Sequence, residues 1–202
     1  MTVGYENRWL FCVHRSIIHK RELKHSDDIL KIMNRLFLAL KVHLDNYKTI
    51  KSDFANTLTG KWTPEENLHI TICYFGNTCS VEELLSRLPL FIKSIPPLKL
   101  ESLDYFMHNK ILYAKTTSKE LQQIHVNICR LFNIKQIKSF IPHATLMRVK
   151  KINDVKKFQQ LMSTYKEKYL GSVDTSFQLM QSHLYPDGAK YECIAKIGEA
   201  QK

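Results

Sequence analysis

The chain has 202 residues, of which 44% are hydrophobic and 10% aromatic, enough for one domain, or one domain made of two similar halves, with a substantial core. The formal net charge of +11 favours a polyanionic partner, with nucleic acid as the first candidate. The sequence lacks a long uncharged apolar run and a CxxC pair, which argues against a membrane-spanning helix, a disulfide framework and a zinc site, and favours a reducing compartment such as the cytoplasm.

Residues 1–33 are interpreted as an extension outside the main domain. Within them, residues 9–26 are basic and amphipathic, so a mitochondrial presequence is one interpretation. The acidic residues on both sides of this segment argue against it, and no secretory cleavage pattern follows. We therefore favour an extension that packs on a single domain formed by residues 34–202.

The first half of this domain shows strand and helix patterns in turn. Residues 35–42 form an apolar run typical of a buried strand, and the mixed segment 43–60 is expected to hold a helix that ends near Gly60. Residues 68–75 alternate apolar and polar side chains, which is the period of a half-buried strand. A serine N-cap and a capping box then predict an amphipathic helix over residues 80–93.

The second half continues in the same way. Residues 98–106 and 111–117 are predicted to form a hairpin, and a helix over residues 119–132 follows. A strand over residues 143–149 then precedes a third amphipathic helix, which Asn153 is expected to cap.

The end of the chain predicts one more hairpin. Residues 176–185 and 191–197 have strand patterns, and a Pro-Asp-Gly turn lies between them. Because hairpins recur between helices, the sequence predicts an α+β architecture with largely antiparallel sheets.

Two of the predicted strands carry a histidine and a threonine two residues apart. They are His69 with Thr71, and His143 with Thr145. Alternation places the two side chains of each pair on one face of their strand. Imidazole can accept or donate a proton near neutral pH, so two facing histidines could act as a general base and a general acid. The threonine hydroxyls could bind oxygens between them. This arrangement suits a phosphodiester and does not require a metal.

Two other interpretations of the paired histidines remain open. Zinc takes three or four N, S or O ligands, and the chain has neither an HExxH motif nor clustered cysteines and histidines. A histidine can also lie in a protein core with its hydrogen bonds satisfied. Two histidines in matched strand contexts favour a site, and we expect no metal and no cofactor.

Basic residues gather around the second His-Thr pair. Between positions 135 and 157 the sequence has one acidic residue, Asp154. The basic residues in the same segment are Lys135, Lys138, Arg148, Lys150, Lys151, Lys156 and Lys157. This cluster favours a bound polyanion over a lysine-rich surface that only maintains solubility.

The stretches HITICYFG and PHATLMRV resemble the two signature strands of the 2H phosphoesterases, and within that group the RNA 2′,3′-cyclic phosphodiesterases, also called 2′–5′ RNA ligases. The resemblance extends to RLFLAL, KWTPEEN and FQLMQSHLYPDGAKYECI, and it covers roughly residues 34 to 198. It implies a bilobal fold in which two antiparallel sheets, related by a pseudo-twofold axis and covered by outer helices, enclose a central groove.

The resemblance also implies a reaction, the hydrolysis of a 2′,3′-cyclic phosphate on RNA to a 2′-phosphomonoester without a metal. His69 would be the general acid that protonates the leaving 3′ oxygen, and His143 the general base that activates water. Thr71 and Thr145 would hold the nonbridging oxygens.

Three further residues depend on how the strands are built. By resemblance, Arg148 is a residue that contacts the substrate phosphate, but strict alternation would aim it away from His143 unless a bulge intervenes. Phe75 is expected either to line the nucleotide site or to lie in the core. Strict alternation also places Cys73 on the face of His69, where its role is open.

Two alternative functions are consistent with the same residues. One is a 2H phosphodiesterase that acts on 2′–5′ oligoadenylate or small cyclic nucleotides, and the other is a nucleotide- or RNA-binding module without turnover. The basic cluster favours a polymeric substrate, and the two intact His-Thr pairs favour turnover; the reverse ligase reaction is a secondary expectation. We expect a cytoplasmic monomer that acts on RNA ends or oligonucleotides bearing a cyclic phosphate.

Overall fold

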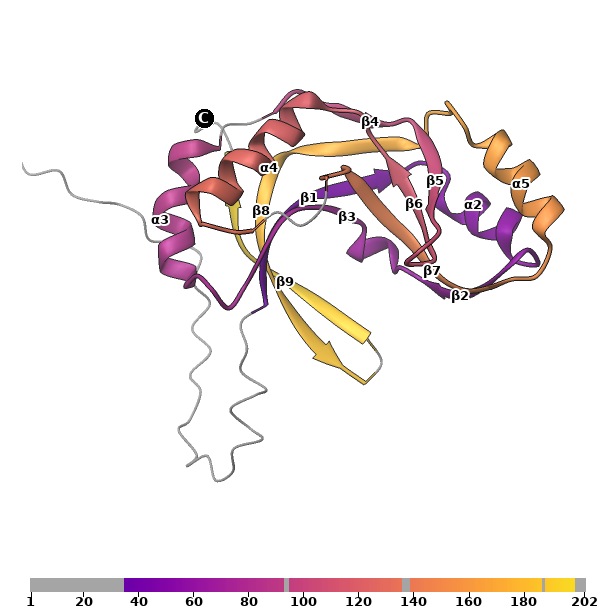
Figure 1. Ribbon diagram of the computed structural model, residues 1–202, viewed down its shortest axis with the longest axis horizontal. Helices are drawn as coiled ribbons and strands as arrows, with labels where there is room; N and C mark the ends of the chain where they lie inside the picture. Colours follow the sequence, from indigo (N-terminus) through magenta and orange to yellow (C-terminus); the bar gives the residue numbers. More distant parts are fainter. Residues whose placement is uncertain (1–34, 93–94, 136–138, 187, 199–202) are drawn as a thin grey trace, which may run out of the picture. The chain divides into compact units, whose positions relative to one another are not determined.

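The computed structural model describes residues 35–92, 95–135, 139–186 and 188–198, so the predicted N-terminal extension lies outside the described residues. Figure 1 shows the arrangement of the helices and strands. In chain order they are β1 (Leu36–Leu44), α2 (Tyr47–Phe54), β2 (Leu58–Trp62), the short 3₁₀ helix η2 (Glu65–Asn67), β3 (His69–Gly76), α3 (Val81–Phe91), β4 (Leu98–Leu100), β5 (Ser102–Phe106), β6 (Ile111–Lys115), α4 (Lys119–Leu131), β7 (His143–Ile152), α5 (Val155–Thr164), β8 (Gly171–Tyr185) and β9 (Gly188–Ile197).

The described strands form one sheet in the order β4-β8-β1-β3-β7-β6-β5, with β2 added to β7 and β9 added to β8. Every pairing between them is antiparallel, which confirms the predicted α+β class. Two sheets were expected, and the structure joins the two groups of strands into one. The join is narrow, because β3 and β7 share a single register pair, Ile70 opposite Ala144.

The helices lie in two groups. Helices α3 and α4 contact each other over one end of the sheet, and α2 and α5 contact each other at the other end (Figure 1). Their apolar faces cover a core that includes the fully buried leucines 36, 38 and 40 of the central strand β1. None of the helices in the described part of the chain has the length and apolarity that a membrane crossing requires.

The N-caps follow the sequence closely. The side chain of Ser80 accepts a hydrogen bond from the backbone N–H of Glu83 at 3.1 Å, as predicted. The third helix is capped by Asp154, which accepts from the N–H of Lys157 at 2.9 Å, and not by Asn153. The two neighbours are both good N-cap residues, so the sequence alone separates them poorly.

Two element boundaries differ from prediction. The first helix ends at Phe54, and Gly60 lies inside the strand β2. A Cβ at Gly60 would lie 2.2 Å from the carbonyl oxygen of Arg148, so the glycine permits the close approach of β2 to β7 and does not end a helix.

The predicted strand 98–106 is two strands separated at Glu101. β4 pairs with β8, whereas β5 pairs with β6, so consecutive segments join opposite ends of the sheet. Local patterning carries no information about which partner a strand finds, and this division was therefore not predictable.

Candidate active site

The two His-Thr pairs meet where β3 and β7 join. Ile70 and Ala144 form the register pair there, and both are fully buried. Because successive side chains of a strand point to opposite faces, the histidine and threonine on either side of each central residue point to the other face. The antiparallel register brings all four predicted side chains together on that face, with each histidine near the threonine of the other strand.

Each histidine ring is oriented by a hydrogen bond from its Nδ1 to a backbone carbonyl oxygen. Nδ1 of His69 lies 2.7 Å from the carbonyl oxygen of Asn67, and Nδ1 of His143 lies 2.7 Å from that of Ile141. A carbonyl oxygen can only accept, so Nδ1 carries the proton in each ring. Nε2 is therefore the nitrogen of each histidine that exchanges a proton with a bound molecule.

The ring of His69 is held by two aromatic neighbours. Its centroid lies 5.2 Å from that of Phe37 on β1 and 5.1 Å from that of Tyr191 on β9. Its Nε2 lies 3.1 Å from Oγ1 of Thr71, which donates to it when the ring is neutral. Strands distant in the sequence thus position this imidazole.

The ring of His143 has an equivalent pair of neighbours from different strands. Its centroid lies 5.0 Å from that of Phe106 on β5 and 5.2 Å from that of Tyr113 on β6. The two aromatic rings stack on each other with a centroid distance of 4.0 Å. Both histidines are therefore fixed by a backbone acceptor and two aromatic contacts.

The surroundings lower the pKa of both histidines below the ordinary value. Burial lowers the pKa of His69 most, its hydrogen bond to the Asn67 carbonyl opposes this, and the charge of His143 lowers the pKa further. Burial also lowers the pKa of His143, against the opposing effect of its bond to Ile141. Two protons on the pair are disfavoured, so one imidazole can accept a proton while the other holds one.

A β-bulge in β3 explains the position of Cys73. Thr71 lies opposite Ala39 and Cys73 lies opposite Leu38, so Ile72 is skipped in the register with β1. The bulge reverses the alternation, which turns Cys73 into the core and Tyr74 toward the face of His69. Cys73 is only 3% exposed, and its Sγ lies 3.9 Å from Sγ of Cys129 on α4. The expectation that Cys73 shares the His69 face was wrong.

A second bulge positions Arg148. It lies three residues after His143, just as the first lies three residues after His69. Thr145 lies opposite Tyr113 and Met147 lies opposite Leu112, so Leu146 is skipped in the register with β6. This is the irregularity that the sequence required for Arg148 to point toward the face of His143. The arginine side chain is exposed there.

Phe75 is a core residue, which corrects the expectation that it could line a nucleotide site. It is 2% exposed, and its ring centroid lies 5.3 Å from that of Phe132. The aromatic side chain on the site face is Tyr74, which is 50% exposed and accepts a hydrogen bond from Nε of Arg35 at 3.2 Å. Because of the bulge at Ile72, Tyr74 points to the site face and Phe75 points into the core.

A pocket of about 730 Å³ lies beside His69. Its lining residues come from β2 and the turn after it, from β7, and from the β8–β9 hairpin. They are Lys61, Trp62, Thr63, Pro64, Glu66, Asn67, Arg148, Leu184, Gly188, Ala189, Lys190 and Tyr191. These residues lie in segments that carry the family resemblance, but the sequence did not indicate that they share a pocket, because only the folded hairpin brings them next to β2.

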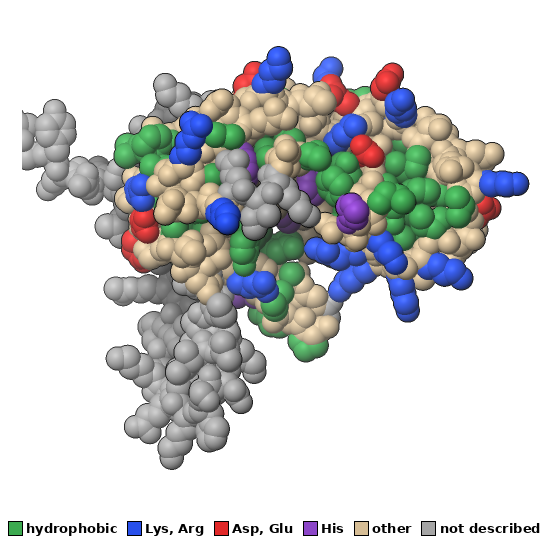
Figure 2. Space-filling view, viewed as in Figure 1, with side chains coloured by type: hydrophobic (Ala, Val, Ile, Leu, Met, Phe, Trp, Pro, Cys, Tyr) green, Lys and Arg blue, Asp and Glu red, His purple; other side chains and the backbone are tan. Residues whose placement is uncertain are grey.

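Part of the basic cluster lies on β7, the strand that brings Arg148 to the pocket. Figure 2 shows Lys and Arg side chains gathered along the edge where β2 and β7 lie in Figure 1. Lys150 and Lys151 extend β7 beyond Arg148, while Lys138 lies outside the described residues. Among the residues that the structure describes, no three His, Cys, Asp or Glu side chains are grouped so as to hold a metal ion.

The chain is similar to known proteins over most of its length. A family model described as the AKAP7 2′5′ RNA ligase-like domain matches residues 31–198. The RNA 2′,3′-cyclic phosphodiesterase of Methanocaldococcus jannaschii is 30% identical over 172 residues, which make up 79% of this chain and 98% of that relative.

Solved structures show the same fold. LigT of E. coli, in a crystal structure of its complex with NADP+, has a TM-score of 0.60 at 20% identity, over 83% of this chain and 99% of LigT. A protein of Thermus thermophilus has a TM-score of 0.61 at 22% identity, over 82% of this chain and 100% of its own. The matched residues include both His-Thr strands. The chain therefore belongs to the AKAP7 2′5′ RNA ligase-like family of the 2H phosphoesterase superfamily, and it is a phosphoesterase.

Proposed function

We propose that this protein is a metal-independent RNA 2′,3′-cyclic phosphodiesterase that forms a 2′-phosphomonoester. The observation that carries the proposal is the meeting of two His-Thr pairs on one face, with both Nδ1 atoms bonded to backbone carbonyls. The name of the Methanocaldococcus jannaschii relative, RNA 2′,3′-cyclic phosphodiesterase, supports the choice of substrate.

The reaction involves two proton transfers, one from the attacking water and one to the leaving oxygen. Nε2 of His143, as the general base, takes a proton from water while the water oxygen forms a bond to phosphorus. The bond between phosphorus and the 3′ oxygen breaks, and Nε2 of His69, as the general acid, gives that oxygen its proton. The products are a 3′ hydroxyl and a 2′-phosphomonoester, and solvent returns the proton from His143 to His69.

The neighbouring side chains stabilise the charge that develops on the phosphoryl group. Thr71 and Thr145 donate hydrogen bonds to its nonbridging oxygens, and Arg148 binds a substrate phosphate. The lowered pKa values of both histidines disfavour a pair in which both imidazoles are protonated, so one of them is available as the base. We further propose that residues 34–202 act as one catalytic domain, as a monomer in the cytoplasm.

The test is incubation with an RNA that ends in a 2′,3′-cyclic phosphate, followed by identification of the phosphomonoester. A 2′-phosphate is expected, with the same rate in EDTA. A 3′-phosphate would show that the 2′ oxygen leaves and would contradict the assigned leaving group, and a large loss in EDTA would contradict metal independence. The absence of any product would overturn the proposal.

The same four side chains would also serve a 2′–5′ linkage, which the description of the matching family model brings to attention. A parallel incubation with 2′–5′ oligoadenylate separates the two substrates. Faster cleavage of the oligoadenylate than of the cyclic phosphate would favour this second function.

A further inference from the structure

The pocket beside His69 is connected to the histidine site through two shared residues. Asn67 provides the carbonyl that orients His69, Tyr191 packs against its ring, and both line the pocket. Its volume of about 730 Å³ lies in the range of sites for small organic ligands. A molecule bound by the two histidines can therefore extend directly into this pocket.

The pocket is lined by three cations and one acid. Lys61 lies opposite Arg148 in the register between β2 and β7, so their side chains share a face. Two positive side chains directly opposite each other both attract an anion that binds between them. Lys190 of β9 and Glu66 are the other charged lining residues. This charge pattern fits a phosphate better than a neutral base.

The ammonium group of Lys61 reaches across the pocket to the hairpin. A Cβ built on Gly188 would lie 2.8 Å from Nζ of Lys61, so the ammonium lies against the backbone at the start of β9. Gly188 also has a φ of +140°, which side chains rarely adopt. The glycine thus leaves room for a positive charge between the two walls.

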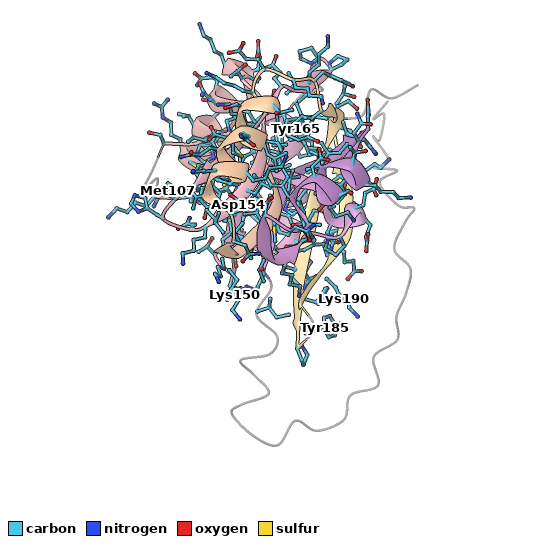
Figure 3. The ribbon with its side chains drawn as sticks, turned by 90° about the vertical axis from the view of Figure 1, so that its right-hand side faces the viewer. Met107, Lys150, Asp154, Tyr165, Tyr185 and Lys190 are labelled. Atoms are coloured by element: carbon cyan, nitrogen blue, oxygen red, sulfur yellow. The ribbon has the colours of Figure 1, made fainter. Side chains whose placement is uncertain are left out.

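The pocket also offers apolar surface to a nucleoside. Trp62 is partly buried, with its ring 6.0 Å from that of Tyr47, and the ring of Tyr191 comes from β9. Figure 3 shows the β8–β9 hairpin extending from the sheet, with Tyr185 at its tip and Lys190 on its second strand. Aromatic rings beside cations are the combination that binds single-stranded nucleic acid.

We propose that this pocket binds the phosphodiester and the nucleotide on the 5′ side of the terminal cyclic phosphate. The inference depends on the proposed function, because it assumes that the cyclic phosphate occupies the two His-Thr pairs. The charged continuation of that terminal nucleotide is its 5′ phosphodiester, which matches the cations. An oligonucleotide of at least two nucleotides is then the preferred substrate over a cyclic mononucleotide.

The experiment compares kcat/KM for a 2′,3′-cyclic mononucleotide and for a dinucleotide ending in the same cyclic nucleotide. The wild-type protein is expected to prefer the dinucleotide by about tenfold or more. Lys61→Ala should lower kcat/KM for the dinucleotide by about tenfold and leave kcat/KM for the mononucleotide unchanged. The slope of log kcat/KM against log salt concentration for the dinucleotide should become shallower by about 1, the value for one phosphate contact. Lys99→Ala, an exposed lysine on β4, is the matched control and should change neither value.

A second variant separates the charge of Lys61 from the length of its side chain. Lys61→Met keeps an unbranched side chain of similar length but removes the charge, so the dinucleotide preference should fall as in Lys61→Ala. Equal loss on both substrates in Lys61→Ala would overturn the proposal, as would a wild-type protein that turns over both substrates equally well. The latter result would leave the proposed function intact, whereas no turnover of either substrate would overturn the function and the pocket assignment together.

Discussion

The strands β3 and β7 have the same plan around their histidines. In each, Nδ1 donates to the carbonyl oxygen two residues before, a threonine follows two residues later, and a bulge comes at the third residue. The fifth residue then points to the site face. Because these features recur at identical spacing, the proton-transfer geometry is built twice from local structure.

The two strands differ at that fifth position and in what surrounds it. β3 presents Tyr74, and β7 presents Arg148 beside Lys61 of β2. The cation-lined pocket lies between β2 and the β8–β9 hairpin and includes Arg148 of β7. The comparison indicates that the chemistry is shared equally by the two strands, whereas the recognition of substrate is not.

The strongest test of the shared chemistry is the removal of either imidazole. His69→Ala and His143→Ala should each lower kcat by about 10²–10⁴-fold, because each removes one proton transfer. The measurement is turnover of RNA ending in a cyclic phosphate, with circular dichroism to verify folding. His43→Ala, at an exposed histidine 2.9 Å from Asp174, is the control and should be fully active. Near-normal turnover in either site variant would contradict the conclusion that each strand provides one of the two proton transfers.

The threonines should show a smaller and matched effect. Thr71→Val and Thr145→Val each remove a hydrogen bond to a charged oxygen, which is worth about 1.5–3 kcal/mol, and should lower kcat by about 10–100-fold. Serine at either position keeps the hydroxyl and should retain most of the activity. A valine variant as active as the serine variant at the same position would contradict this role.

The pH profile can show which histidine gives rise to each of its limbs. Burial lowers the pKa of both histidines, so the rate maximum should lie below about pH 6.5, the value for an ordinary imidazole. Phe106→Ala admits water to His143 and should raise its pKa. A base with a higher pKa is protonated at higher pH, so the acidic limb of the profile should move to higher pH.

The matched variant on the other strand is Tyr191→Ala. It should raise the pKa of His69, and an acid with a higher pKa keeps its proton longer, so the alkaline limb should move to higher pH. A cyclic mononucleotide is the substrate of choice, because it leaves the neighbouring pocket empty. If the two variants move the opposite limbs, His69 gives rise to the acidic limb and His143 to the alkaline limb.

The smallest effects concern two neighbours on β3. Phe75→Leu should lower the free energy of unfolding by about 1 kcal/mol, because the ring is buried, and should leave kcat/KM unchanged. Tyr74→Ala should leave stability unchanged and raise KM. Denaturant unfolding and steady-state kinetics measure the two quantities, and a raised KM in Phe75→Leu at normal stability would restore the original expectation for that residue.

Much of the fold could be predicted because it depends on local patterns. The alternation in β3 as far as Thr71, that in β7 as far as Thr145, and the cap at Ser80 hold in the structure. Motif spacing puts the histidine and threonine of each pair on one face, and the family resemblance implied that the two pairs face each other. Their convergence was then a matter of one register pair, Ile70 with Ala144.

The remainder depended on partners that local patterns do not specify. Unbroken alternation assigned Cys73 wrongly and left two positions open for Phe75, because a bulge arises from the register with β1 and not from the sequence of β3 alone. Arg148 could be interpreted only by assuming such a bulge. The strand β2 and the pocket beside it escaped prediction, since Gly60 and Gly188 serve close approaches between segments distant in the chain.

The paired bulges have a consequence for how proteins with this plan can diverge. Each bulge makes the residue five positions after the histidine independent of the strand periodicity that fixes the histidine and the threonine. Mutation at that position can therefore alter ligand preference without disturbing proton transfer. Loss of a single residue at Ile72 or Leu146 would remove the bulge but leave Tyr74 or Arg148 on the site face, one position closer to the histidine. In alignments of related chains, substitutions at this position should therefore report ligand specificity.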